Sequence, residues 1–175
     1  MNLNNRLSTA IFNNDLAEVK HCLASGARVD EVILLQAIWT NRADIMRFVL
    51  KHSARFIKDY GGALLHFALY AEKLQVARFL IENGADIGFT MWFGATKGHL
   101  ENVKFLVKHS KSRKIKPHID YCLVVASCCG HLAVVEFLLK SGANPNATDK
   151  NGKTALSWAK TNAIRQTLIC AGARK

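Results

Sequence analysis

A short phrase repeats along the chain, and this repetition limits the possible folds more than any other feature. GHLENVKFLVKHSK at 98–111 returns, with changes, as GHLAVVEFLLKSGA at 130–143. Echoes of its ending occur at 24–28, 82–86 and 170–174. An echo at a nearly fixed interval is the signature of stacked supersecondary units. Such a chain is expected to offer an extended binding face rather than a single enclosed pocket.

The small residue after each Leu-rich run measures the period of the repeat. It falls at Gly26, Ser53, Gly84, Ser110, Gly142 and Gly172, at intervals of 26 to 32 residues. The intervals of 27 and 26 residues predict shortened loops after the first and third units. The six predicted units are about 7–30, 31–58, 59–87, 88–115, 116–148 and 149–175. We expect them to form a single domain over 1–175.

Each unit shows the same internal order of segments. An apolar segment with a central alanine comes first, as in LLHFALY at 64–70. A break follows, and then a segment such as 132–140, whose apolar residues recur with helical spacing. Gly142 comes next, and glycine readily takes the left-handed conformation that ends a helix. The pattern predicts a helix, a tight turn, a second helix and an extended loop in every unit.

This order of segments resembles the ankyrin repeat. The match is clearest at 130–159, where GHLAVVEFLLKSGANPNATDKNGKTALSWA keeps the Gly-His, Val-Val, Leu-Leu, Gly-Ala and Asp-x-x-Gly-x-Thr elements. The Thr-Pro-Leu-His element of the family is never complete in this chain. The resemblance implies an all-α solenoid of stacked helix-turn-helix units with short hairpin loops. It further implies protein–protein recognition through a concave face.

Large aromatic residues stand where the first helix of the early units is expected to end. The matched positions of the six units hold Phe12, Trp39, Tyr70, Thr96, Cys128 and Thr161. The resemblance places these positions in the concave groove, and aromatic side chains are common anchors of protein interfaces. Phe12, Trp39 and Tyr70 are therefore candidate partner-binding residues. The alternative is that they fill gaps between neighbouring helices, above all Phe12 in the first, capping unit.

For two other aromatic residues, the expected position is different. Trp92 and Phe93 take the place of the family's histidine and its neighbour in the fourth unit. We expect both of them to face the core.

The positive charge is concentrated in the second half of the chain. The net charge is +11, and residues 97–175 hold 14 Lys and Arg against 4 Asp and Glu. The run 108–116 contains five cations and no anion. It is either a solvated loop or a landing patch for an acidic partner, a nucleic acid or an anionic lipid. We include Lys97, Lys111, Arg113 and Lys114 among the candidate partner-binding residues.

Catalytic and metal-binding patterns are weak in this sequence. The five cysteines have irregular spacing without a Cys-x-x-Cys pair, which favours free structural thiols over a metal site or a disulfide framework. His99 and His131 belong to the Gly-His element, where we expect the imidazole to bond backbone groups between helices. Asn146 resembles a hairpin asparagine that some ankyrin proteins present to an asparaginyl hydroxylase, or it is an unmodified hairpin residue.

We therefore expect a non-enzymatic binding module that needs no cofactor or metal. It would act by occupancy, as an inhibitor, adaptor or effector, on a protein partner that is acidic. The alternative is an electrostatic binder of nucleic acid or of an anionic membrane surface through the basic half. The sequence carries no evident signal peptide, so a cytoplasmic monomer is expected, and a secreted effector reaching a host cytosol remains open.

Overall fold

The fold is almost entirely helical. The structure is a computed structural model that describes residues 2–40, 42–52, 54–109 and 115–174. Within these ranges it contains twelve helices and no strand, and a single isolated antiparallel bridge joins Thr148 to Thr154. The expected all-α repeat architecture is thus confirmed. The chain divides into two compact parts, which are larger than the six repeats and are described separately. They are Met1–Ile87, called unit 1 from here on, and Gly88–Lys175, called unit 2.

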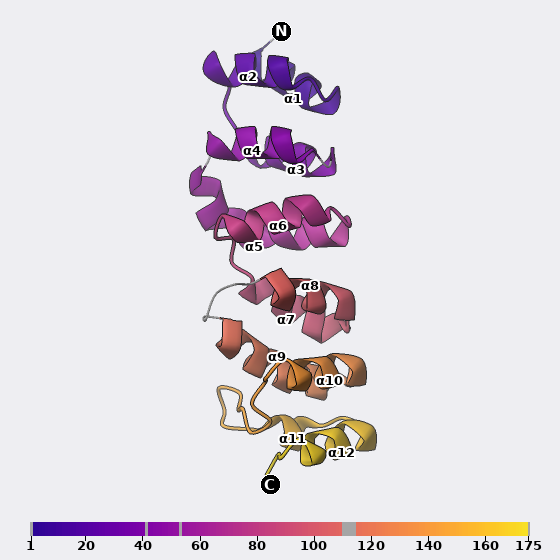
Figure 1. Ribbon diagram of the computed structural model, residues 1–175. Helices are drawn as coiled ribbons and strands as arrows, with labels where there is room; N and C mark the ends of the chain where they lie inside the picture. Colours follow the sequence, from indigo (N-terminus) through magenta and orange to yellow (C-terminus); the bar gives the residue numbers. More distant parts are fainter. Residues whose placement is uncertain (1, 41, 53, 110–114, 175) are drawn as a thin grey trace. The chain divides into compact units, whose positions relative to one another are not determined.

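Unit 1 consists of three successive helix pairs (Figure 1). Its helices are α1 (Leu3–Phe12), α2 (Leu16–Ala24), α3 (Glu31–Trp39), α4 (Ala43–Lys51), α5 (Ala54–Tyr70) and α6 (Leu74–Glu82). The first helices α1, α3 and α5 contact one another in order, and so do the second helices α2, α4 and α6. Ala10, Ala37 and Ala68 are buried where the first helices pack. A small residue there lets neighbouring helices approach closely.

Unit 2 repeats the arrangement with three further pairs (Figure 1). Its helices are α7 (Gly88–Lys97), α8 (Leu100–His109), α9 (Ile115–Cys129), α10 (Leu132–Lys140), α11 (Ala155–Trp158) and α12 (Asn162–Cys170). Here α9 lies between α7 and α11, and α10 lies between α8 and α12. The last pair is atypical because α11 has only four residues.

Two first helices are longer than the repeat pattern predicted. Helix α5 begins at Ala54 and crosses the expected unit boundary at 58–59, and α9 begins at Ile115. The additional residues therefore lengthen a helix where an extended loop was expected. Buried Ile57 and Ile119 anchor the added turns to the core. Pro117 lies in the first turn of α9, where its missing N–H costs no helical hydrogen bond.

Side-chain caps account for several helix starts. Asp15 accepts a hydrogen bond from the backbone N–H of Glu18, and Asp30 accepts one from Ile33. In the last pair, Thr154 caps α11 and Thr161 caps α12 in the same way. Each cap satisfies an N–H group that has no partner within its own helix.

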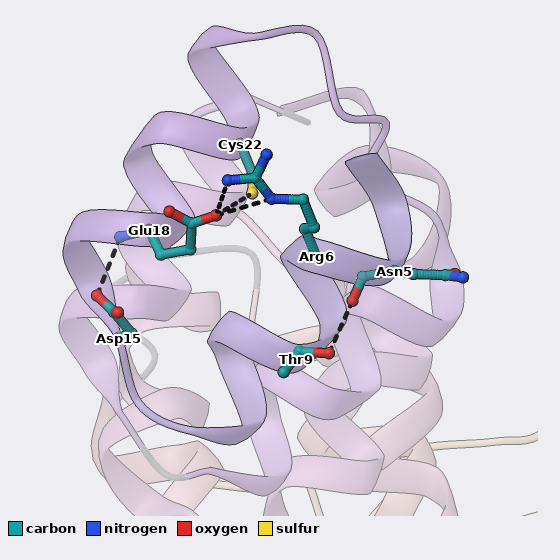
Figure 2. A network of polar contacts seen from close by, with 6 residues as sticks. All are labelled: Asn5, Arg6, Thr9, Asp15, Glu18 and Cys22. Carbon is teal, nitrogen blue, oxygen red and sulfur yellow. Dashed lines mark hydrogen bonds and ion pairs between the residues drawn. The ribbon is translucent and has the colours of Figure 1, made fainter. Parts of the chain in front are cut away.

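A polar clip joins the two helices of the first pair (Figure 2). Arg6 on α1 donates from Nε and Nη2 to Oε1 of Glu18 on α2, at 3.1 and 2.7 Å. Buried Cys22 donates its thiol to the same oxygen at 3.5 Å. The bond from Arg6 is the main reason why the pKa of Glu18 lies below its ordinary value. Burial raises the pKa of Cys22, so this thiol stays protonated.

The hairpin region of the last pair is tied to the end of the chain. The Asn146 side chain donates to the Gly172 carbonyl at 3.2 Å and accepts from the Arg174 backbone N–H at 2.8 Å. Both ends of the amide are thus used in holding the C-terminal turn. These bonds give Asn146 a structural role in the hairpin region.

Candidate functional site

The three candidate aromatic residues of unit 1 end successive first helices. Phe12, Trp39 and Tyr70 are the last residues of α1, α3 and α5. They are 76%, 65% and 74% exposed, so none of them fills a gap in the core. Phe12 is not buried by its capping position. Large apolar side chains exposed at matched positions are typical of an interaction surface rather than of packing.

The helix face that carries these aromatic residues is uncharged. Residues three, four and seven positions before each of the three helix ends lie on the same face. None of the residues reached in this way is Asp, Glu, Lys or Arg, although the chain holds 37 of them. We call this surface the aromatic face of unit 1. It favours apolar contacts, and hydrogen bonds between uncharged groups, with a binding partner.

A groove runs along part of this face. It has a volume of about 330 Å³, and Phe12, Leu35, Trp39 and Phe67 contribute most of its apolar lining. The ring centroids of Trp39 and Phe67 lie 6.2 Å apart in a tilted arrangement. Such ring contacts hold aromatic side chains in fixed positions. A hydrogen bond of 2.9 Å from the Ser8 hydroxyl to Gln36 Oε1 also links α1 to α3 beneath the groove.

A left-handed residue fixes the end of most first helices. Asn14 and Glu72 have φ of 58° and 57°, two residues after Phe12 and Tyr70. Gly98 and Gly130 hold the matched places in unit 2, with φ of 74° and 90°. This conformation turns the chain sharply into the second helix. It is the reason why the preceding aromatic side chain stands at a helix end.

Unit 2 contains a second groove, with a different lining. Its volume is about 300 Å³, and its walls include Trp92 on α7, Tyr121 and Cys128 on α9, and Trp158 on α11. Trp92 is 36% exposed, so its expected position in the core is wrong. It lines the groove together with Val124, which holds the matched position of the next repeat.

The neighbouring residues of unit 2 agree only in part with the sequence pattern. Phe93 is half-buried in contact with the rings of Phe89 and His99, so only part of it faces the core. Thr161 was expected at the end of a first helix, but it caps the start of α12. The shortness of α11 displaces that position.

Of the charged candidates, Lys97 lies among the described residues. Lys97 ends α7 in unit 2, and its Nζ lies 5.9 Å from the ring centroid of Phe93. Lys111, Arg113 and Lys114 lie outside the residues that the structure describes. Their role remains a prediction from the sequence.

The Gly-His element has the structural role that the sequence indicated. Nε2 of His131 donates to the backbone carbonyl of Thr96 at 2.9 Å, which links α7 to the turn before α10. A Cβ on Gly98 would lie 2.5 Å from Nδ1 of His131, so the close approach itself requires glycine. His131 is therefore engaged in holding two repeats together.

The cysteines are distributed between core and surface. Cys22 and Cys122 are buried, and burial raises the pKa of Cys122 to about 12. Cys128 and Cys170 are exposed. Among the described residues, no group of three or more His, Cys, Asp or Glu side chains is placed to hold a metal ion. No helix in those ranges is long and apolar enough to cross a membrane.

Successive helix pairs stack in the same arrangement and expose residues at the ends of their first helices. This architecture defines a repeat protein built of stacked helix pairs. The family model for ankyrin repeats matches residues 7–91 and again 91–175. The chain therefore belongs to the ankyrin repeat family, whose members are generally protein–protein interaction modules and whose fold is generally non-enzymatic.

Curated relatives support this assignment. The chain is 27% identical to the ankyrin repeat protein YahD of Escherichia coli K12, over 94% of both chains. It is 30% identical to human ankyrin repeat domain-containing protein 63, but it spans only 40% of that longer protein.

Solved structures share the fold. An ankyrin repeat domain from Acinetobacter baumannii AYE superimposes with a TM-score of 0.66 at 26% identity, covering 96% of this chain and 98% of that one. The ankyrin repeat domain of human ASB11 reaches a TM-score of 0.62 at 19% identity, covering 97% and 83%. The second likeness establishes the fold alone.

The sequence pattern missed the groove of unit 2 for an identifiable reason. The prediction relied on one position of each repeat, which in α7 and α9 holds the small residues Thr96 and Cys128. Trp92 and Tyr121 stand four and seven residues before these positions, on the same helix face, and Trp158 is the last residue of the short α11. A prediction based on the whole helix face, rather than on one position of it, would include Trp92 and Tyr121.

Proposed function

We propose that the protein binds a protein partner through the aromatic face of unit 1, with Trp39 and Tyr70 as its main anchors and Phe12 at the edge. One observation carries this proposal. Three successive first helices each end in a large aromatic residue that is at least 65% exposed. Interfaces concentrate their binding energy in such residues, and the uncharged surroundings can exclude water around them.

The charge distribution supports an acidic partner. The uncharged face contributes no electrostatic attraction, whereas residues 97–175 carry the large excess of cations. A field of that sign accelerates the approach of an acidic protein without contributing much to the affinity at contact. We infer recognition by occupancy, in which the charged half steers the partner and the apolar face holds it.

The test compares the wild-type chain with Trp39→Ala and Tyr70→Ala. A partner captured from the source cells with the wild-type chain is titrated against each variant by calorimetry. We expect each change to weaken binding by roughly 2 kcal/mol or more, as anchor residues do. Stability should fall by less than the ~3–5 kcal/mol typical of removing a buried aromatic side chain.

Tyr60→Ala is the matched control, because Tyr60 lies on the same helix α5 and is also exposed. It should leave the affinity within a factor of a few of the wild type. If Trp39→Ala and Tyr70→Ala merely unfold the protein, and charge reversal at Lys111, Arg113 and Lys114 abolishes binding, the proposal is wrong. Binding would then belong to the basic half, as in the polyanion alternative.

A further inference from the structure

The groove of unit 2 is a recess with aromatic walls. Trp92, Tyr121 and Trp158 are 36%, 41% and 36% exposed, and they come from three successive first helices. The small residues Thr96 and Cys128 stand at the repeat positions that Tyr70 and Trp39 hold in unit 1, one residue before the ends of α7 and α9. The aromatic residues therefore form walls instead of a ridge. A recess of this kind gains free energy when an apolar group enters and releases its water.

Lysine side chains border this recess. Nζ of Lys153 lies 4.6 Å from the ring centroid of Trp158, on one of its walls. Lys160 packs against Gly130, next to the lining residue Cys129. Lys97 follows the lining residue Thr96, although its Nζ lies near the ring of Phe93, which does not line the recess. Exposed lysines next to an apolar recess present a positive rim to an approaching segment.

The one carboxylate that lines the recess is already engaged. Oδ1 of Asp149 accepts the backbone N–H groups of Asn151 at 2.8 Å and Lys153 at 3.0 Å, and Oδ2 accepts the indole N–H of Trp158 at 2.9 Å. These bonds, led by the one from Lys153, hold the pKa of Asp149 below its ordinary value. The carboxylate therefore serves the hairpin and is poorly placed to receive a cation from a partner.

We propose that this basic-rimmed recess is a second protein-binding site, which takes a partner segment with an apolar or aromatic anchor flanked by Asp or Glu. We expect the anchor to be uncharged. A carboxylate would lose its water against the negative faces of these rings, and a cation would be repelled by the neighbouring lysines, one of which already lies over Trp158. The flanking carboxylates complement the lysine rim and the net positive charge of the whole unit. The site uses residues and a unit that the aromatic face of unit 1 does not include.

A random peptide display library selected against the full-length chain tests the specificity. We expect enriched peptides that combine Trp, Phe or Leu with neighbouring Asp or Glu. For such a peptide, Lys153→Glu should weaken binding roughly tenfold, since reversing a rim charge turns attraction into repulsion. Lys140→Glu makes the same change of charge on α10, away from the recess, and should leave the affinity nearly unchanged.

The exposed thiol of Cys128 reports occupancy of the recess directly. In a Cys129→Ser, Cys170→Ser background the other two cysteines, Cys22 and Cys122, are buried. The enriched peptide should slow alkylation of Cys128, and a bulky maleimide there should abolish peptide binding. The matched control keeps Cys170 and replaces Cys128 and Cys129 with serine. Its thiol should be neither protected by the peptide nor able to block binding when alkylated.

Other results would overturn the proposal. Basic peptides that lose affinity on Asp149→Asn would show a cationic occupant instead. If alkylation of Cys128 does not affect peptide binding, and Trp39→Ala abolishes it, all binding belongs to unit 1. That result would leave the proposed function intact and remove the second site. A library without an enriched acidic and apolar pattern would also refute the second site.

Discussion

Single backbone positions decide where each helix pair turns. After α1, α5, α7 and α9, a residue one or two places beyond the helix takes a left-handed conformation, which most residues with a side chain adopt only at a cost. Unit 2 places glycine there, but unit 1 has Asn14 and Glu72. Asparagine tolerates this region better than most residues, whereas glutamate does not. The turn at Glu72 is therefore held in place by the surrounding repeats and carries strain.

Glu72→Gly should stabilise the protein. Removing the strain gains about 1 kcal/mol, and the more flexible unfolded chain gives back part of it, which leaves roughly 0.5 kcal/mol. Urea denaturation followed by circular dichroism measures the change in midpoint. Asn14→Gly is the control, and it should gain less. A lower midpoint for Glu72→Gly would mean that the glutamate side chain contributes contacts that outweigh its strain.

Gly142→Val should destabilise the protein by at least about 1 kcal/mol. Gly142 has φ of +90°, in a region that a β-branched residue rarely adopts. A Cβ at this position would meet no atom within 4 Å, so the cost comes from the backbone and not from a clash. Thermal unfolding gives the measurement. An unchanged melting temperature would show that the turn after α10 relaxes to another conformation at no cost.

At the scale of elements, the clip between α1 and α2 makes one contribution to stability dependent on pH. Glu18 has a lowered pKa in the folded chain, so its stabilising effect is present above the ordinary pKa of a carboxyl group. The effect is lost as the pH falls through the lowered value, because the protonated group no longer attracts Arg6. The ion pair is partly exposed, with Arg6 and Glu18 side chains 42% and 32% accessible, so water screens it.

Glu18→Gln should therefore be less stable than the wild type at neutral pH, and the difference should shrink below about pH 4. Denaturation midpoints across this range provide the test, with Arg6→Gln expected to show the same convergence. A difference that stays constant into acid would mean that Glu18 acts through packing alone.

The sequence predicted the helix pairs well and their lengths poorly. Periodic apolar residues and the glycines that follow them are local signals, so the alternation of helices could be read directly. The early start of α5 depends on burial of Ile57 against neighbouring helices, which no local pattern shows. The family pattern instead suggested a loop at that place.

The candidate site was predictable to the same extent. Phe12, Trp39 and Tyr70 could be placed at helix ends because the repeat register fixes those positions. The exposure of Trp92 could not be predicted, because it depends on the residues that the next two repeats place opposite it. Trp92 is 36% exposed and lines a groove with Val124 of the next repeat and Trp158 of the short α11.

At the scale of the whole molecule, the excess of positive charge is concentrated in one part of the chain. Unit 1 has nearly balanced charges, whereas unit 2 holds 14 cations and 4 anions. We expect the rate of association with an acidic partner to fall with increasing salt, while the rate of dissociation changes little. Stopped-flow mixing at several salt concentrations measures both rates.

Charge reversal at Lys111, Arg113 and Lys114 should reduce that rate of association and its dependence on salt. Trp39→Ala should instead raise the rate of dissociation, because it removes an anchor and leaves the electrostatic field unchanged. A salt-independent association rate in the wild-type chain would exclude steering by unit 2.

The exposed helix ends have a consequence for how proteins of this kind diverge. Phe12, Trp39 and Tyr70 contribute little to the core, so exchanging them alters what the surface recognises at small cost to folding. Selection can therefore try new partners there one substitution at a time. The alanines two residues earlier on the same helices lack this freedom, because they are buried where the helices pack. The same short stretch of these repeats thus holds a position constrained by packing beside one that is open to change.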